Sequence, residues 1–257
     1  MAVKKPWADG PFELIPTPSS LGDKPKGSQA IVPEMLIVHN FLLRGINSIY
    51  LQCVNVERSP AVIPDFVNFA ACWGSLLHEH HEAEETMMFP SMEKLAGVTG
   101  LMDANVDQHR AFHGGLEAYE GYLSSVKEGK EKYDGQKLRG LIDSFMPVLR
   151  QHLHDEIDTL VKLSQYEDKA DWDKWFKDLQ AEILKKANDP KVKVEEFPYA
   201  LQTHDTTFEG GKYAAWPPMP WFVLILFRWV FVPKHKGWWQ FAPCDTHGRP
   251  RDLPFAE

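Results

Sequence analysis

Cysteine is scarce in this chain, and its scarcity argues against two kinds of scaffold. The 257 residues include three cysteines, Cys53, Cys72 and Cys244, and no two of them form a Cys-x-x-Cys pair. An odd number of cysteines at wide spacing predicts neither a disulfide framework nor a thiolate zinc site. We therefore expect a reducing environment.

The chain also lacks an excess of basic residues and a targeting segment. It has 28 Lys and Arg against 36 Asp and Glu, and the resulting net charge of -8 argues against a nucleic-acid partner. Residues 1–10 have neither the apolar core of a signal peptide nor the arginines of a transit sequence. These absences predict a cytoplasmic, intracellular protein. Its apolar share of 44% is that of an ordinary globular protein.

Apolar residues recur at steps of three and four along most of the chain, which predicts an all-α fold. Residues 1–28 contain five prolines and predict an irregular arm instead. Four amphipathic helices are expected after the arm, over residues 29–55, 65–90, 102–127 and 136–166. Short loops between long helices favour an up-down-up-down four-helix bundle, here with a distortion at Pro147.

The stretch 77–90, Leu-His-Glu-His-His-Glu-Ala-Glu-Glu-Thr-Met-Met-Phe-Pro, holds three histidines and four glutamates. Residues four apart share one face of a helix, and the apolar stripe of this helix continues onto His80 and Glu84. A buried carboxylate without a partner is costly, and a metal ion is a suitable partner. The alternatives are His81 and Glu85 as the inward pair, or a solvated, charge-rich helix end.

Each of the other three helices adds histidine in phase with its apolar residues. The candidates are His39, the pair His109 and His113, and the pair His152 and Glu156. Together with His80 and Glu84 they offer five imidazoles and two carboxylates, enough for two divalent ions if both carboxylates bridge. Nitrogen and oxygen donors suit iron, zinc or manganese. Five histidines divided three and two leave one metal short of a ligand, where dioxygen or another diatomic molecule can bind.

These motifs, in this order, resemble the hemerythrin family and in particular its HHE-type cation-binding branch. The resemblance covers about residues 30–165 and rests on four motifs: His39 in Val-His-Asn-Phe-Leu-Leu-Arg, His80-His81-Glu-Ala-Glu84-Glu85 closing on Phe89-Pro90, His109-Arg-Ala-Phe-His113 and His152-Leu-His-Asp-Glu156. It implies two iron ions bridged by hydroxide or oxide, with Glu84 as a bridging ligand.

The last helix departs from the oxygen carriers of that family. Those carriers have an aspartate five residues after the histidine, where this chain has Ile157. By resemblance to the HHE-type relatives, Glu156 is expected to serve as the ligand.

Some 90 residues follow the predicted bundle. A further amphipathic helix is expected over 171–187, and an irregular tail rich in Trp and Pro follows it. We therefore divide the chain into an arm (1–28), the bundle (29–166) and an extension (167–257) that packs on the bundle. The apolar run Trp221 to Val232 is too short to cross a bilayer, which takes about 20 residues. We expect it to pack on the bundle and cover the metal pocket; peripheral membrane contact and a subunit interface are the alternatives.

Three functions remain open at this point. The first is a non-haem diiron protein that binds dioxygen or nitric oxide. The second is a diiron oxidase or oxygenase that acts on a small organic substrate under the extension. The third is an iron- or oxygen-responsive sensor module. The sequence does not fix the oligomeric state.

Overall fold

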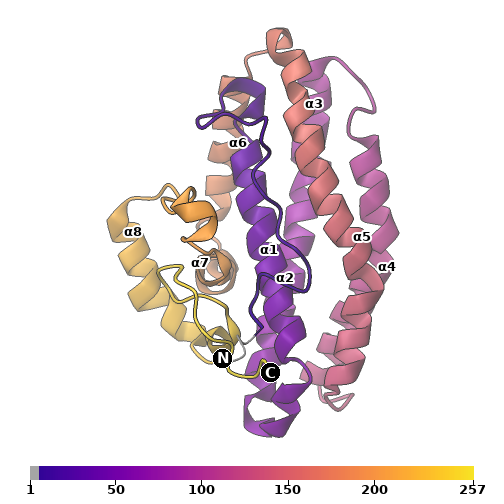
Figure 1. Cartoon of the computed structure of the whole chain (residues 1–257), viewed down its shortest axis with the longest axis vertical. Coiled ribbons are helices and arrows are strands. Elements are labelled where there is room, and N and C mark those ends of the chain that lie inside the picture. Colours follow the sequence, from indigo (N-terminus) through magenta and orange to yellow (C-terminus); the bar gives the residue numbers. More distant parts are fainter. Residues whose placement is uncertain (1–5) are drawn as a thin grey trace, which may run out of the picture.

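Four long helices stand side by side and form the body of the molecule in this computed structural model, which describes residues 6–257 (Figure 1). The α-helices are α1 (Val32–Gln52), α2 (Ile63–Ala83), α3 (Phe89–Ala96), α4 (Asp103–Lys127), α5 (Gly135–Lys162), α6 (Trp172–Lys186), α7 (Phe197–Thr203) and α8 (Trp221–Leu226). A π-helical turn, η4 (Glu84–Met88), joins α2 to α3, so that these elements act as one long rod. The all-α bundle predicted from the sequence is confirmed.

Local signals set the ends of the helices close to where the sequence placed them. Pro64 lies in the first turn of α2, where backbone N–H groups have no partner within the helix, so its missing N–H costs no hydrogen bond. The side chain of Asp134 caps α5 by accepting a hydrogen bond from the Lys137 amide. Gly97 ends α3 in the left-handed conformation, with φ of 70°. The distortion expected at Pro147 does not divide α5, which runs unbroken from Gly135 to Lys162.

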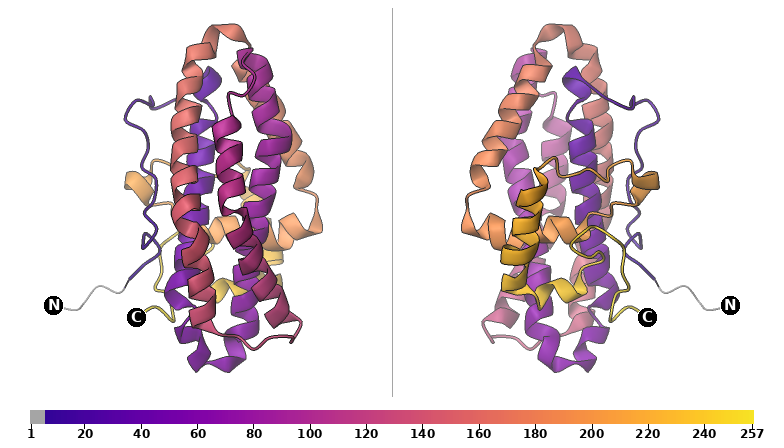
Figure 2. Two further views of the ribbon diagram at one scale, coloured as in Figure 1. Left: turned by 90° about the vertical axis from the view of Figure 1, so that its right-hand side faces the viewer. Right: turned by 90° about the vertical axis from the view of Figure 1, so that its left-hand side faces the viewer.

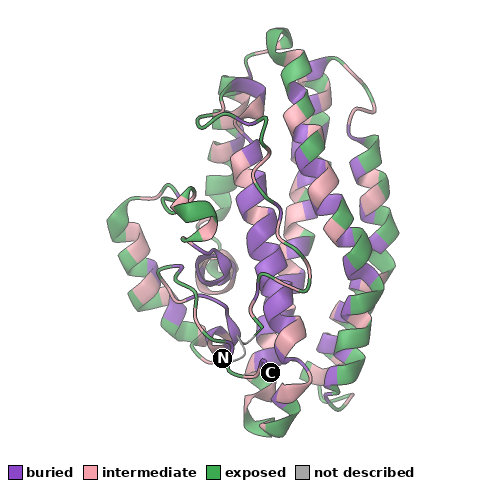
Figure 3. Ribbon diagram, viewed as in Figure 1, coloured by how far each residue is buried: buried purple, intermediate pink, exposed green. Residues whose placement is uncertain are grey.

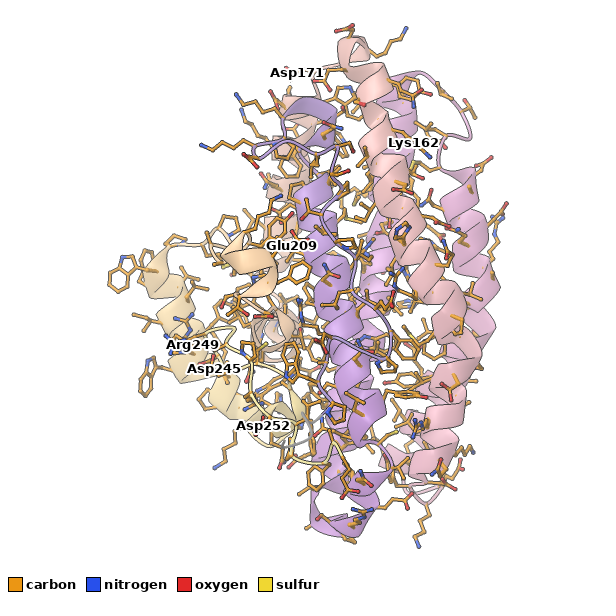
Figure 4. All side chains as sticks on the ribbon, viewed as in Figure 1. Lys162, Asp171, Glu209, Asp245, Arg249 and Asp252 are labelled. Carbon is orange, nitrogen blue, oxygen red and sulfur yellow. The ribbon has the colours of Figure 1, made fainter. Side chains whose placement is uncertain are left out.

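The hydrophobic core lies along the axis of the bundle, and each helix contributes its apolar stripe to it. Trp73 of α2 is fully buried and lies against Phe145 of α5 and Tyr119 of α4, with ring centroids 5.9 and 5.4 Å apart. Figure 3 shows the buried side of each helix turned toward the others, and Figure 4 shows side chains filling the space between the ribbons. The helical stretch Pro60–Ala96 is long and apolar enough to cross a membrane by length and composition alone, but here it supplies the core of the bundle.

The N-terminal arm runs antiparallel along α1. Asn47 and Asn40 of α1 hold it with their side-chain amides: Asn47 bonds the backbone of Phe12, and Asn40 bonds both the N–H and the carbonyl of Ile15. Further hydrogen bonds tie the arm to the extension, from Trp7 Nε1 to the Arg251 carbonyl and from Thr17 to Glu209. The arm therefore contacts both the bundle and the extension.

The extension packs on the outer side of α1 and α2, where Figure 2 shows it from a second direction. Tyr199 of α7 stacks on Phe69 of α2 at 5.0 Å, and the Gln52 side chain of α1 donates to the Phe241 carbonyl at 2.9 Å. Trp216 of the extension contacts Phe41 of α1 at 6.0 Å.

The run Trp221 to Val232 packs on the bundle only at its end, where Val232 joins the hydrophobic core, and the expected cover over the metal pocket stays a prediction. Trp216 approaches α1 at Phe41, about 200° around the helix from His39. Within the run, Phe227 is buried against Phe197 of the extension itself. Its apolar side chains on the other face point to solvent, because α8 lies at the margin of the molecule (Figure 1).

Candidate metal centre

Two groups of metal-ligating side chains meet in the middle of the bundle and share one carboxylate. In the first group, His81, Glu84, His109 and His152 place one donor atom each within 4.8 Å of one another. The second group combines, under the same limit, His39, His80, Glu84 and Glu156. The two groups are adjacent, each could hold a metal ion, and Glu84 belongs to both.

The shape of the α2 end explains why two neighbouring histidines both point inward. The rod containing α2 lies between α1 on one side and α4 on the other, and consecutive helical residues diverge by about 100°. His80 meets His39 of α1 at 5.3 Å between ring centroids, and His81 meets His109 of α4 at 4.3 Å. Glu84 begins the π-helical turn, a distortion often found at functional sites.

Hydrogen bonds on the outer side of three rings fix which ring nitrogen faces the centre. His39 Nδ1 donates to the Leu153 carbonyl at 2.8 Å, and His152 Nδ1 donates to the Gln108 side-chain carbonyl at 3.2 Å. His109 Nδ1 donates to Glu85 Oε1 at 2.6 Å. In each ring this leaves Nε2 with a lone pair directed inward, which is the arrangement that outer partners impose on metal-bound histidines.

Those inward lone pairs face other lone pairs at short range. His109 Nε2 and His152 Nε2 are 3.0 Å apart, and His39 Nε2 is 3.3 Å from Glu156 Oε2. Buried polar atoms normally have hydrogen-bond partners, yet seven atoms of this cluster have none within the described chain: Nε2 of His39, His80 and His81 and both carboxylate oxygens of Glu84 and Glu156. Cations placed between these donors would satisfy all of them, so the residues fit a pair of bound metal ions.

Burial sets the protonation of the cluster in a direction that favours metal binding. Desolvation lowers the pKa of His80 to about 4 and that of His152 to about 3, so both rings are neutral ligands at pH 7. Desolvation and the nearby Glu156 charge raise the pKa of Glu84 to about 8. Burial also disfavours ionised Glu156, but the contacts of that carboxylate with His39 outweigh burial and lower its pKa. Without a cation, one of the two carboxyls thus holds a proton that a metal would displace.

His113 is the one sequence-predicted ligand that the structure does not bring into the cluster. Its side chain is 62% exposed and lies 3.5 Å from Glu117 on the same helix. The buried stripe of α4 steps from His109 to Phe112 and Leu116, so His113 falls on the solvent side. His39, His80, Glu84, His109, His152 and Glu156 lie in the cluster as the sequence placed them. His81, the alternative to His80, is the fifth imidazole.

Two residues outside the cluster orient its histidines, a role that the sequence did not predict. Glu85, considered earlier only as an alternative ligand, is instead half exposed and orients His109. Gln108 orients His152 and itself donates to Asp155 at 2.9 Å. The sequence gives no signal for Gln108, because an amide next to a histidine has no characteristic spacing.

Comparison with protein-family models matches residues 31–164 to the hemerythrin HHE cation-binding domain, which is about half of the chain and contains the whole cluster. The chain belongs to the hemerythrin family. Metal-cation binding is therefore shown at the level of the family, and the His and Glu groups of this hemerythrin fit such a site.

A curated relative extends the similarity beyond the bundle. The dimeric xanthone biosynthesis cluster protein R11 of Cryptosporiopsis sp. (strain 8999) is 35% identical over 256 residues, covering 98% of this hemerythrin and 94% of the relative. The arm and the extension are therefore shared with that protein as well. No solved structure matches this hemerythrin with significance.

Proposed function

We propose that this hemerythrin is a non-haem diiron protein that binds dioxygen or nitric oxide inside its four-helix bundle. The observation that carries the proposal is the shared position of Glu84, which belongs to both ligand groups. A carboxylate with two unpartnered oxygens between two sets of imidazoles is the arrangement of a bridging ligand. One metal ion would leave the other group of donors unsatisfied.

Charge balance supports two divalent ions in this place. Two such ions bring four positive charges, and Glu84 and Glu156 remove two when both are ionised. A bridging hydroxide or oxide removes more, so the remaining charge is small for a buried site. Because burial lowers the pKa of His80, His81 and His152, these neutral rings add donors without adding charge.

The unequal ligand groups favour binding of a small diatomic molecule. One group has three imidazoles, His81, His109 and His152, whereas the other has two, His39 and His80. The second group also has Glu156, so each group offers four donors when only Glu84 is shared. If Glu156 bridges as well, the second position has one ligand fewer and is the one with room for an external ligand. Ferrous ions held there would supply the electrons that dioxygen takes up.

Aromatic side chains restrict the volume around the first group. Phe89 stacks on His109 at 5.9 Å, and Phe112 contacts His152 at 5.6 Å and His81 at 5.1 Å between ring centroids. These apolar rings occupy the space beside the first group. The surroundings thus support binding of a diatomic molecule better than binding of a bulky one.

The test is anaerobic loading with ferrous iron, followed by metal analysis and visible spectroscopy on exposure to oxygen. We expect two irons per chain and an absorption band that appears with oxygen and disappears when oxygen is removed. One iron per chain, or loading with zinc in preference to iron under competition, would contradict the proposal.

A second candidate function is oxygen-dependent oxidation of a small organic molecule. The relative named for a biosynthesis cluster favours it, because the similarity extends along nearly the whole chain. Irreversible oxygen consumption after iron loading, increased by an added organic substrate, would select this function over reversible binding.

A further inference from the structure

The outer face of the segment 221–231 is the most apolar surface of the described chain. Nine large apolar side chains are strongly exposed among residues 6–257, and six of them lie in this segment: Trp221, Phe222, Ile225, Leu226, Trp229 and Val230. Trp221 and Trp229 are 73% and 78% exposed. A soluble domain rarely leaves such a surface without a partner.

The exposed residues follow one side of a helix. They recur as adjacent pairs at steps of four through α8 and the π-helical turn η8 (Phe227–Phe231), so their side chains form one continuous stripe. The opposite side is occupied: Phe227 packs on Phe197, and Arg228 Nε donates to the Thr246 carbonyl at 2.8 Å. The contacts of Phe227 and Arg228 fix the helix on the extension, and the stripe on its other side faces solvent.

Charge is distributed around this stripe in an unusual way. The whole chain is acidic, yet residues 210–244 contain no Asp or Glu and four basic residues, Lys212, Arg228, Lys234 and Lys236. Lys234 and Lys236 are exposed just after the stripe. An acidic neighbour from another segment, Glu195, lies 4.0 Å from His235 and thus contacts that imidazole.

We propose that the stripe of residues 221–230 docks on the surface of an anionic lipid bilayer. Exposed Trp at both ends of an apolar helix suits the interface between headgroups and acyl chains. The lysines that follow it would contact acidic headgroups. At about 1.5 Å per residue, the eleven residues of α8 and η8 extend about 16 Å, so the helix lies in the interface and does not span the bilayer.

A second copy of the chain is a poorer occupant of the stripe. Symmetric pairing would bring two identical stripes together, each followed by Lys234 and Lys236. No acidic residue between 210 and 244 is available to balance these charges. An anionic surface supplies the missing charge. The proposal concerns the extension alone and does not depend on the identity of the metal.

The test is co-sedimentation of the full-length, metal-loaded protein with vesicles of phosphatidylcholine containing 30 mol% phosphatidylserine, and with vesicles of phosphatidylcholine alone. We expect binding to the anionic vesicles and a blue shift of Trp emission on binding. The double variant Trp221→Ser and Trp229→Ser should weaken binding roughly tenfold or more. Each of Lys234→Gln and Lys236→Gln should weaken it roughly fivefold.

A control removes two exposed apolar side chains elsewhere on the surface. Ile183 and Leu184 of α6 are 51% and 58% exposed, so Ile183→Ser with Leu184→Ser should bind vesicles as the unchanged protein does. All variants should keep the same metal content and melting temperature. Absence of vesicle binding, equal binding to both vesicle types, or a dimer that dissociates only in the Trp double variant while vesicles stay unbound would overturn the proposal.

Discussion

Glu85 Oε1 accepts a 2.6 Å hydrogen bond from His109 Nδ1, and this contact decides which nitrogen of His109 faces the metal centre. Burial alone disfavours the imidazolium, but the carboxylates of Glu84 and Glu85 outweigh it and raise the pKa of His109. A carboxylate in this position also makes the ring a stronger donor. Glu85 therefore acts on the metal through His109.

Replacing Glu85 should weaken metal binding without removing a ligand. We expect Glu85→Ala to lower the affinity for one of two metal ions by about 10- to 100-fold, as is usual for outer partners of metal-bound histidines. Titration against a chelator of known affinity measures the change. The control is Glu82→Ala, because Glu82 is exposed on the same helix. Equal affinities of the two variants would show that Glu85 has no such role.

His81 and His113 form a matched pair of tests for the ligand set. His81→Ala removes one of three imidazoles from its group, so metal content should fall from two ions per chain toward one. His113→Ala changes a surface side chain, and two ions per chain should remain. Metal analysis after dialysis distinguishes the two. The reverse pattern would restore His113 as a ligand and remove His81.

The metal-free protein should be most stable near pH 6.5. Below that pH, His80 and His152 bind protons in the unfolded chain, where their pKa is about 6.5, but stay neutral in the folded protein, where burial lowers their pKa. Because the unfolded state then binds more protons, stability falls as pH falls. Glu84 has the opposite effect, because its raised pKa of about 8 means that the folded carboxyl keeps a proton that the unfolded one releases. Its contribution is lost as pH rises toward 8.

Metal should remove the alkaline part of this profile, since a bound cation needs ionised Glu84. Thermal melts from pH 5 to 8.5, with metal and after chelation, measure the difference. We expect metal to raise the melting temperature by about 10 °C, for saturation at roughly a thousand times the dissociation constant. The gap should widen from pH 6.5 to 8, and a gap that narrows over that range would contradict the assignment of the raised pKa to Glu84.

Gly45 allows the extension to approach α1. A Cβ at this position would clash with the hydroxyl of Tyr199 on α7. Gly45→Ala should therefore destabilise the protein by about 1–3 kcal/mol, the usual cost of overpacking. Gly114→Ala is the control, because that helical glycine faces open space, and it should stabilise by up to about 1 kcal/mol. Urea denaturation measures both, and equal effects would mean that α7 moves aside without cost.

The helical framework could be predicted from the sequence because periodicity and end signals agree along most of the chain. The expected third helix, 102–127, differs from α4 (Asp103–Lys127) by a single residue at its start. Such agreement follows from local rules, since proline, glycine and capping residues act within a few positions of themselves.

Ligand placement was harder to predict because it depends on how helices surround one another. The sequence treated His80 and His81 as alternatives, since a single helix presents only one of two adjacent residues to a single neighbour. The structure uses both, because α2 borders α1 and α4 at once. His113 lies outside the cluster because the buried stripe of α4 advances by three residues after His109, whereas the sequence shows equally good apolar steps of four.

The run Trp221 to Val232 shows a different limit. An apolar run predicts burial but not the identity of the partner, and part of this run has no partner within the described chain. Only the arrangement of the extension shows which side of the helix is already occupied.

The hydrogen bond between Trp7 and Arg251 joins residues separated by 244 positions. The candidate ligands lie between residues 39 and 156, so the bundle that holds them is made before the segment that covers the outer side of α1. Contacts this distant in sequence form late, so we expect the cluster to assemble before the arm and the extension close over α1.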